Sequence, residues 1–250
     1  TMYPSVSPGD TQNRTLSADD ISGVQSLYGV QATGSPAIST VSPAYAWIAG
    51  GTRITVTGTN LNGGDPQSMT VAGVNVTDLT IIDQTHAEFT LPAGVAPGAV
   101  DVALSHAQGS ATAASAFFYQ SVRVSQPLTI LGTGELELYF PSDATRTFGA
   151  APAIGFSPGI NLSRFGTGTD HRVVPVNEDT LFNAFYYGGL PTVFPDFTGT
   201  LDANGRAYVH VHMPYVAQLV GFYFIVTAVT HDNLSPSGIA NISNALTVVI

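Results

Sequence analysis

The sequence predicts an all-β protein of two sandwich domains, with one short helix before them. Residues 52–58 alternate polar and apolar side chains, as a strand with one buried face does. Similar short runs recur at intervals of about ten residues, separated by turn-forming residues. The 250 residues include 26 glycines and 16 prolines, and only 10% are charged, which is typical of β modules and not of long helices.

Charge and cysteine content narrow the classes of function. The formal net charge is −10, which disfavours nucleic acid and anionic membrane surfaces as partners, because both are bound through basic residues. No apolar run approaches the roughly 18 residues of a membrane-spanning helix, so we expect no membrane insertion. Cysteine is absent, which excludes disulfides and thiolate metal sites. Larger bacterial surface domains often do without disulfides, and we expect a secreted bacterial protein.

The clearest helix signal lies at about residues 18–28. Ser17 and Asp20 have the spacing of a capping box, in which each side chain accepts a hydrogen bond from the other residue's backbone amide. Four apolar residues then form one stripe at helical spacing: Ile21, Val24, Leu27 and Tyr28. A lone helix of about eleven residues is marginal in water. We therefore expect a sandwich or a neighbouring subunit to cover the stripe, which makes these four residues interface candidates.

This first segment, residues 1–34, resembles the tail of a matrixin-type metzincin metalloprotease. Met2-Tyr3-Pro4 matches the family's Met-turn, and Leu16–Gly29 matches its last helix. The family's zinc motif, H-E-x-x-H-x-x-G-x-x-H, does not occur in the chain. The three zinc ligands and the glutamate base are thus missing, and with them the zinc-water chemistry. We expect a metalloprotease remnant that is not an enzyme and has no catalytic residue, cofactor or metal.

Residues 35–120 have the pattern of a complete sandwich domain. Besides the strand at 52–58, β-rich runs are expected at Met69–Val76, Leu79–Ile82, Ala87–Leu91, Ala99–Ser105 and Ala116–Tyr119. Their regular spacing is typical of an immunoglobulin-like sandwich.

Within this domain, residues 36–119 resemble the IPT/TIG family of immunoglobulin-like domains. The matching residues are Ile38–Pro43, Ala49–Thr52, Val56–Asn60, Pro97-Gly98 and Phe117–Tyr119. The resemblance implies a scaffold and no particular chemistry, because such sandwiches serve many functions.

Residues 121–250 are predicted to form a second β-sandwich. Strands are expected at Leu136–Phe140, Tyr208–Met213, Leu219–Val229 and Asn244–Ile250. Asn204-Gly205 is expected to be the turn pair of a hairpin. The last fifty residues or so resemble a C-terminal β-sandwich of large secreted bacterial proteins, which implies no assigned chemistry.

Several polar residues could form sites. His210 and His212 lie two apart on one strand, so they share a face and could ligate a metal, although ordinary surface histidines fit as well. Asp170-His171 and His231-Asp232 could be parts of an acid–base site, or simply loop residues. The Asn60–Asp65 loop offers oxygen ligands for calcium, or is a plain turn.

A dense aromatic region follows Thr180. Its interface candidates are Phe182, Phe185, Tyr186 and Tyr187, and Phe194 and Phe197 follow. Core filling is one interpretation, and a subunit interface or a glycan platform is the other.

Together these patterns favour a non-catalytic structural or adhesive protein of the extracellular cell surface, self-assembling into a homo-oligomer, filament or layer. One alternative is the accessory C-terminal region of a secreted zinc metalloprotease. Another is a carbohydrate-binding module with a glycan or extracellular-matrix ligand.

Overall fold

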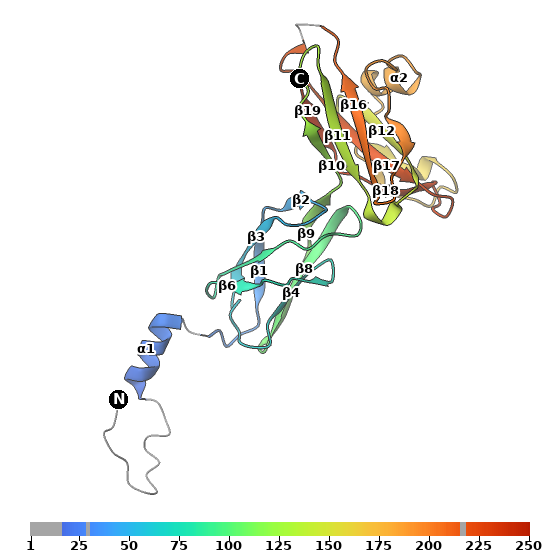
Figure 1. Ribbon diagram of the computed structural model, residues 1–250. Coiled ribbons are helices and arrows are strands. Elements are labelled where there is room, and N and C mark those ends of the chain that lie inside the picture. The colour runs from blue at the N-terminus through green and yellow to red at the C-terminus, as the bar shows by residue number, and fades with distance from the viewer. Residues whose placement is uncertain (1–16, 29–30, 216–218) are drawn as a thin grey trace, which may run out of the picture. The chain divides into compact units, whose positions relative to one another are not determined.

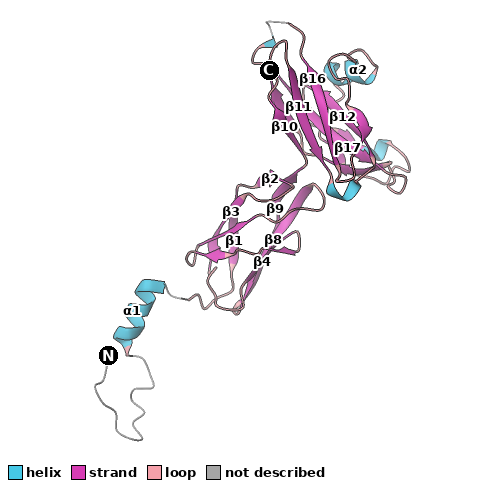
Figure 2. Cartoon of the chain, in the orientation of Figure 1, coloured by secondary structure: helices cyan, strands magenta, loops and turns pink. Residues whose placement is uncertain are grey.

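The computed structural model describes residues 17–28, 31–215 and 219–250. As expected, these residues are mostly β-structure (Figure 1), with two short α-helices (Figure 2). They divide into two compact units. The first unit contains the described residues up to Pro43, Arg53–Leu91 and Asp101–Ala116, and the second contains Ala44–Thr52, Pro92–Val100 and Phe117–Ile250. No helix among the described residues is long and apolar enough to cross a membrane.

Helix α1 (Ala18–Tyr28) begins at the predicted capping box, which is confirmed. Ser17 Oγ accepts a hydrogen bond from the Asp20 amide at 3.2 Å, and Asp20 Oδ2 accepts from the Ser17 amide at 3.2 Å. The two side chains also contact each other, with 2.6 Å between Ser17 Oγ and Asp20 Oδ2. Met2-Tyr3-Pro4, the predicted Met-turn, lies outside the described residues.

The first antiparallel sheet lies entirely within the first unit. In the order β1-β3-β7-β6, its strands are Ala37–Ser42, Arg53–Thr59, His86–Thr90 and Thr80–Ile81. Ile54 and Val56 of β3 are fully buried, and their polar neighbours are not, as the alternating sequence predicts. Phe89 of β7 is also fully buried.

The second sheet has the order β2-β9-β8-β4-β5. Its strands are Tyr45–Trp47, Gly109–Gln120, Gly98–His106, Ser68–Val71 and Val74–Asn75. β9 continues past Ala116 into the second unit, where β2 pairs with it in parallel. The β-rich run expected at 69–76 is the β4–β5 hairpin. Ala72 and Gly73 both have positive φ, which turns the chain back between two paired strands.

The rest of the second unit is a second β-sandwich. One sheet has the order β10-β11-β16, with strands Val122–Gln126, Thr133–Tyr139 and Arg206–His212. The other has the order β15-β12-β17-β18, with strands Thr198–Thr200, Thr147–Ala153, Tyr223–His231 and Ile239–Ile242; β19 (Leu246–Val249) also pairs with β17. Side chains of both sheets form one buried cluster that includes Leu138, Val209 and Val226.

The opposite face of the β12–β17 sheet is covered by the segment between β12 and β15. This segment contains β13 (Ile160–Asn161), β14 (Val173–Val174) and helix α2 (Thr180–Tyr186). Short 3-10 helices lie at Pro141–Asp143 and Leu162–Arg164. A smaller apolar cluster lies here, containing Leu162, Val174 and Val176. β17 is therefore buried on both faces, which explains its nearly continuous apolar sequence.

The turn around Asn204-Gly205 differs from the predicted hairpin turn. The strands on either side of it, β15 and β16, belong to different sheets. Gly205 has φ +80° but Asn204 is not in the left-handed region, so the turn is not of the primed type. Asp202 shapes it instead, because its Oδ1 accepts from the Asn204 and Arg206 amides, both at 2.8 Å.

Candidate functional site

A pocket of about 360 Å³ opens in the second sandwich, on the face of the β12–β17 sheet that α2 covers. Gly149 and Ala151 of β12 lie opposite Val229 and Thr227 of β17 in the sheet register, and all four line the pocket. Because Gly149 and Ala151 have little or no side chain, the sheet leaves open space here. Aliphatic and aromatic side chains from the covering segment form most of the remaining wall.

Helix α2 forms one wall of the pocket, and Asp179 fixes its start. Asp179 Oδ1 accepts hydrogen bonds from the Leu181 and Phe182 amides, at 3.1 and 3.2 Å. Its Oδ2 accepts from the Ile154 and Gly155 amides, at 2.7 and 3.0 Å. One carboxylate thus caps the helix and ties it to the end of β12.

The C-terminal end of α2 is a Schellman motif. The Gly188 amide donates to Phe185 O at 2.9 Å, and the Gly189 amide donates to Ala184 O at 2.8 Å. Gly188 has φ +76°, a conformation that favours glycine. Both ends of the helix are therefore fixed by specific contacts.

The aromatic region divides into a buried set and an exposed set. Phe194 and Phe197 are buried, and Phe185 contacts both, with ring centroids 5.8 Å apart in each case. These three fill the core. Tyr186 and Tyr187 are instead 69% and 80% exposed.

Three rings contact one another here: Phe182 and Tyr186 of α2, and Tyr187, which follows the helix. Phe182 and Tyr186, four residues apart, stack with centroids 5.8 Å apart and an interplanar angle of 10°. Tyr187 meets Tyr186 edge to face at 5.4 Å. Phe182, Phe185 and Tyr186 line the pocket. Sequence reasoning named these residues as interface candidates; whether they form an interface stays a prediction.

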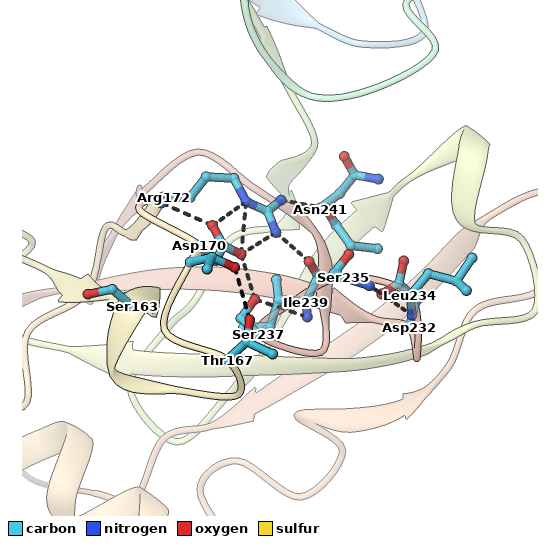
Figure 3. A network of polar contacts seen from close by, with 12 residues as sticks. Ser163, Thr167, Asp170, Arg172, Asp232, Leu234, Ser235, Ser237, Ile239 and Asn241 are labelled. Atoms are coloured by element: carbon cyan, nitrogen blue, oxygen red, sulfur yellow. Dashed lines mark hydrogen bonds and ion pairs between the residues drawn. The ribbon is translucent and has the colours of Figure 1, made fainter.

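An ion pair within one loop, between Asp170 and Arg172, is hydrogen-bonded to a second loop beside the pocket (Figure 3). Asp170 is buried, and its Oδ2 accepts from Arg172 Nη2 at 2.7 Å and from Ser237 Oγ at 2.6 Å. Arg172 also donates to the carbonyl oxygens of Ile239, at 2.5 Å, and Ala240, at 2.6 Å. These hydrogen bonds, chiefly from Arg172 and then from Ser237, hold the pKa of Asp170 well below its usual value. Asp170 is therefore a structural anion.

His231-Asp232, the other suspected acid–base fragment, also reaches this rim. Asp232 accepts from the Ser235 amide at 2.7 Å and pairs with Arg146 at 3.1 Å. Its pKa is lowered, mainly by the hydrogen bond from the Ser235 backbone. His231 lines the pocket, whereas His171 is exposed. Asp170 and Asp232 thus hold loops in place, and neither is paired with a histidine.

His210 and His212 share a face of β16, as predicted, with ring centroids 6.4 Å apart. His210 Nδ1 lies 2.5 Å from Asp196 Oδ2, and Nε2 lies 3.4 Å from Glu135 Oε2. The Asp196 hydrogen bond is the main cause of a raised His210 pKa. Within residues 17–28, 31–215 and 219–250, no group of three or more potential ligands is placed to hold a metal ion.

The suspected calcium loop makes contacts within the chain. Asn60 Nδ2 donates to Ser35 O at 3.1 Å, and Asn62 Oδ1 accepts from the Ala32 amide at 3.1 Å. These contacts position the loop, and calcium binding there stays a prediction.

The α1 stripe is described in part. Ile21 and Val24 are 42% and 50% exposed, while the side chains of Leu27 and Tyr28 lie outside the described part of the chain. What covers this stripe stays a prediction.

One comparison with known proteins identifies a segment of the chain. Residues 36–119 match the family described as the IPT/TIG domain. No curated protein sequence matches the chain. Similar solved structures include the Yersinia pseudotuberculosis adhesin InvE, at 15% identity and a TM-score of 0.26 over 86% of this chain and 57% of the adhesin.

Two further solved structures are similar to a comparable degree. SGBP-B, from a complex xyloglucan utilization locus in Bacteroides uniformis, has 14% identity and a TM-score of 0.31, over 86% of this chain and 73% of that protein. The plexin A4 extracellular region has 11% identity and a TM-score of 0.34, over 90% of this chain. The chain spans 57% of the adhesin and 19% of the plexin region. The assignment rests on the family match: residues 36–119 form an IPT/TIG domain.

Proposed function

We propose that this chain is a non-catalytic structural or adhesive protein of the extracellular cell surface, and that its copies associate into a filament or layer. The exposed aromatic face of α2 carries the proposal. Tyr186 and Tyr187 are largely exposed, yet their rings are held in fixed orientations by each other and by Phe182. Such tyrosines suit an interface, because the ring buries apolar area while the hydroxyl forms hydrogen bonds.

The polar groups around the pocket support a binding role rather than a catalytic one. Asp170, Asp232 and Ser237 hold the rim loops together, and the Thr227 hydroxyl donates to Pro175 O at 3.1 Å. Catalysis by a nucleophile needs a base within hydrogen-bond reach of it. The Ser237 hydroxyl lies 2.6 Å from Asp170, but the lowered pKa of that carboxylate makes it a poor base.

The α1 stripe supplies a second surface for association. Ile21 and Val24 are both exposed large apolar residues on a helix too short to be stable alone. If α1 of one copy packs on a different surface of the next copy, the contact is heterologous and continues into a filament unless it closes into a ring.

The association is tested by sedimentation velocity of the full chain and of a Tyr186→Ala/Tyr187→Ala double variant. We expect the double variant to lose the large species. Tyr208→Ala is the matched control, because Tyr208 is 50% exposed on β16, and it should assemble as the unmodified chain does. Equal assembly by the double variant would show that α2 is not the contact surface.

A Val24→Asp variant tests the contribution of α1. Its matched control is Gln25→Asp, which adds the same charge to the neighbouring exposed position off the stripe. Loss of large species in Val24→Asp alone supports the head-to-tail contact, and equal sedimentation of the two variants rejects it.

A second candidate is the accessory region of a secreted zinc metalloprotease. The helix and capping box at Ser17 and Asp20, which the metzincin resemblance implies, favour it. The intact mass and zinc content of the native protein separate the two cases. A longer chain with one zinc per molecule supports the protease, and a zinc-free chain of this length removes it.

A third candidate is a carbohydrate-binding module, in which the exposed rings of Tyr186 and Tyr187 would stack on sugar rings. Binding to an array of glycans tests it. Saturable binding that is lost in the double tyrosine variant supports this function, and absence of binding across the array rejects it.

A further inference from the structure

The pocket beside α2 has a size, a wall chemistry and a polar group that together select a ligand. We propose that it binds an aromatic molecule of about two rings with one hydrogen-bonding group. Tyr186 lines this pocket and also belongs to the surface proposed for association, so the pocket is tested with residues that do not belong to α2.

The volume sets the size of the ligand. A closed apolar cavity of about 150 Å³ is known to bind benzene. The pocket here is about 360 Å³, more than twice that volume, and it falls within the usual range for small-molecule sites. Two fused rings, or one ring with a short arm, would therefore fill it.

The walls favour a planar, apolar body. On one side lies the sheet, where Gly149 and Ala151 of β12 present backbone and a single methyl group. Phe165, Phe182 and Phe185 add aromatic side chains to the lining. A flat ligand could lie against the sheet and meet these rings in the offset or edge-to-face arrangements that such pairs prefer.

One imidazole provides a polar contact over the floor of the pocket. His231 Nε2 lies 3.5 Å from the position that a Cβ atom on Gly149 would occupy. The His231 side chain, which is exposed, has no hydrogen bond or ion pair with other described residues, whereas the hydroxyls of Thr227 and Ser237 are both engaged. A hydroxyl or similar group on the ligand can therefore pair with His231. A sugar, with a hydroxyl on most of its carbons, would leave several polar groups buried without partners, which is costly.

The rim is held in place before any ligand binds. Ser237 and Ile239, which line the pocket, are tied to Asp170 and Arg172 by the rim ion pair (Figure 3). A preformed site loses less conformational entropy on binding.

The probe is 2-naphthol, titrated into the full chain by calorimetry. We expect saturable one-to-one binding. A Gly149→Val variant should bind roughly ten-fold more weakly or worse, because its side chain occupies the floor. Gly149→Ala is the milder variant, since its Cβ meets no atom closer than His231 Nε2, and it should retain the fold and still weaken binding. Thermal unfolding of both variants confirms that they are folded.

The polar contact is tested by His231→Phe with naphthalene as the comparison ligand. The unmodified chain should prefer 2-naphthol over naphthalene by roughly two- to ten-fold, the range of one net hydrogen bond, and the variant should lose that preference. If His231→Phe weakens the binding of both ligands equally, His231 acts through packing alone, and the hydrogen-bond assignment is overturned.

A second ligand, N-acetyl-Phe-Tyr-amide, distinguishes a free aromatic compound from a peptide. Its two aromatic side chains offer the same chemistry within a peptide. Binding of 2-naphthol alone indicates a free aromatic compound, and binding of both indicates a peptide. The proposal fails if neither binds, or if Gly149→Val binds 2-naphthol as well as the unmodified chain does. It also fails if cellohexaose occupies the site in a Gly149-dependent way. None of these results bears on the tyrosine-dependent sedimentation, so the two proposals can fail separately.

Discussion

Glu137 shows how this acidic chain uses its few cations. It lies on β11 and is only 3% exposed, and its carboxylate pairs with two arginines. Arg123 donates to Glu137 Oε2 from Nε at 2.8 Å and from Nη2 at 2.6 Å, and Arg206 contacts Oε1. The Arg206 guanidinium also stacks over Tyr139, 3.9 Å from the ring centroid. A buried carboxylate is tolerated here because both of its oxygens are paired.

We predict that Glu137→Gln lowers the free energy of unfolding by about 1–3 kcal/mol. The loss stays at this level because Arg123 and Arg206 are part-exposed and can bind water when the carboxylate is neutralised. Urea unfolding measures it. Glu178→Gln is the control, because Glu178 and Arg164 form an exposed pair that should contribute less than about 1 kcal/mol. Equal effects of the two substitutions would contradict the prediction.

His210 makes stability depend on pH. Its imidazole faces Asp196 and Glu135, while His212 lies beside it on β16. The Asp196 hydrogen bond, more than the nearby charges, raises the His210 pKa above 6.5. A raised pKa means that the protonated form stabilises the fold. This contribution is complete below the unfolded pKa of about 6.5 and is lost as the pH rises through the folded pKa.

We therefore expect the urea midpoint of unfolding to fall as pH increases through the His210 titration. In Asp196→Asn, the slope of this midpoint against pH should be smaller. NMR titration of the ring should show its pKa moving back toward the ordinary value in Asp196→Asn. His171→Gln is the control, since His171 is exposed, and it should leave the slope unchanged. If the slope persists in Asp196→Asn, the pH dependence comes from another group.

At the scale of the element, helix α2 depends on contacts from outside itself. Asp179 accepts two amides of the helix and two amides at the end of β12. We predict that Asp179→Ala costs about 2 kcal/mol, the upper range for loss of an N-cap, because four backbone donors lose one acceptor group. Asp179→Asn keeps one side-chain oxygen and should cost less. Urea unfolding ranks the two, and an Asp179→Ala variant as stable as the unmodified chain would contradict this role.

Some elements could be predicted from sequence, and others could not. β3 was predictable because one buried face imposes alternation, with Ile54 and Val56 inside. Helix α2 was missed because it has only seven residues. In addition, two of the four amides that its capping residue Asp179 accepts, at 154 and 155, are distant in sequence. Its local signals were present, with Asp179 before the helix and Gly188 after it.

The residues of the pocket were even harder to predict from sequence. The aromatic residues Phe182, Phe185 and Tyr186 stood out in the sequence, and they line the pocket. The floor at Gly149 and the polar group at His231 lie far from them along the chain, and only the sheet pairing brings these residues together. Asp170 and Asp232, noticed as acid–base candidates, are ion-paired instead. Asp170 pairs with Arg172, only two residues away, and Asp232 pairs with Arg146, which is distant in sequence.

At the scale of the whole molecule, the arginines are structural. Each of the six arginines that the structure describes forms an ion pair with a carboxylate. With a net charge of −10, the chain repels copies of itself at long range. Association must therefore come from short-range apolar contacts, which the exposed α2 tyrosines and the α1 stripe provide. Because salt screens the repulsion but not those contacts, assembly should strengthen as ionic strength rises.

Sedimentation velocity of the unmodified chain, over a range of protein and salt concentrations, tests the proposed association most directly. The account predicts species larger than the monomer, growing with protein concentration and with added salt. A single monomeric species under all of these conditions would contradict it.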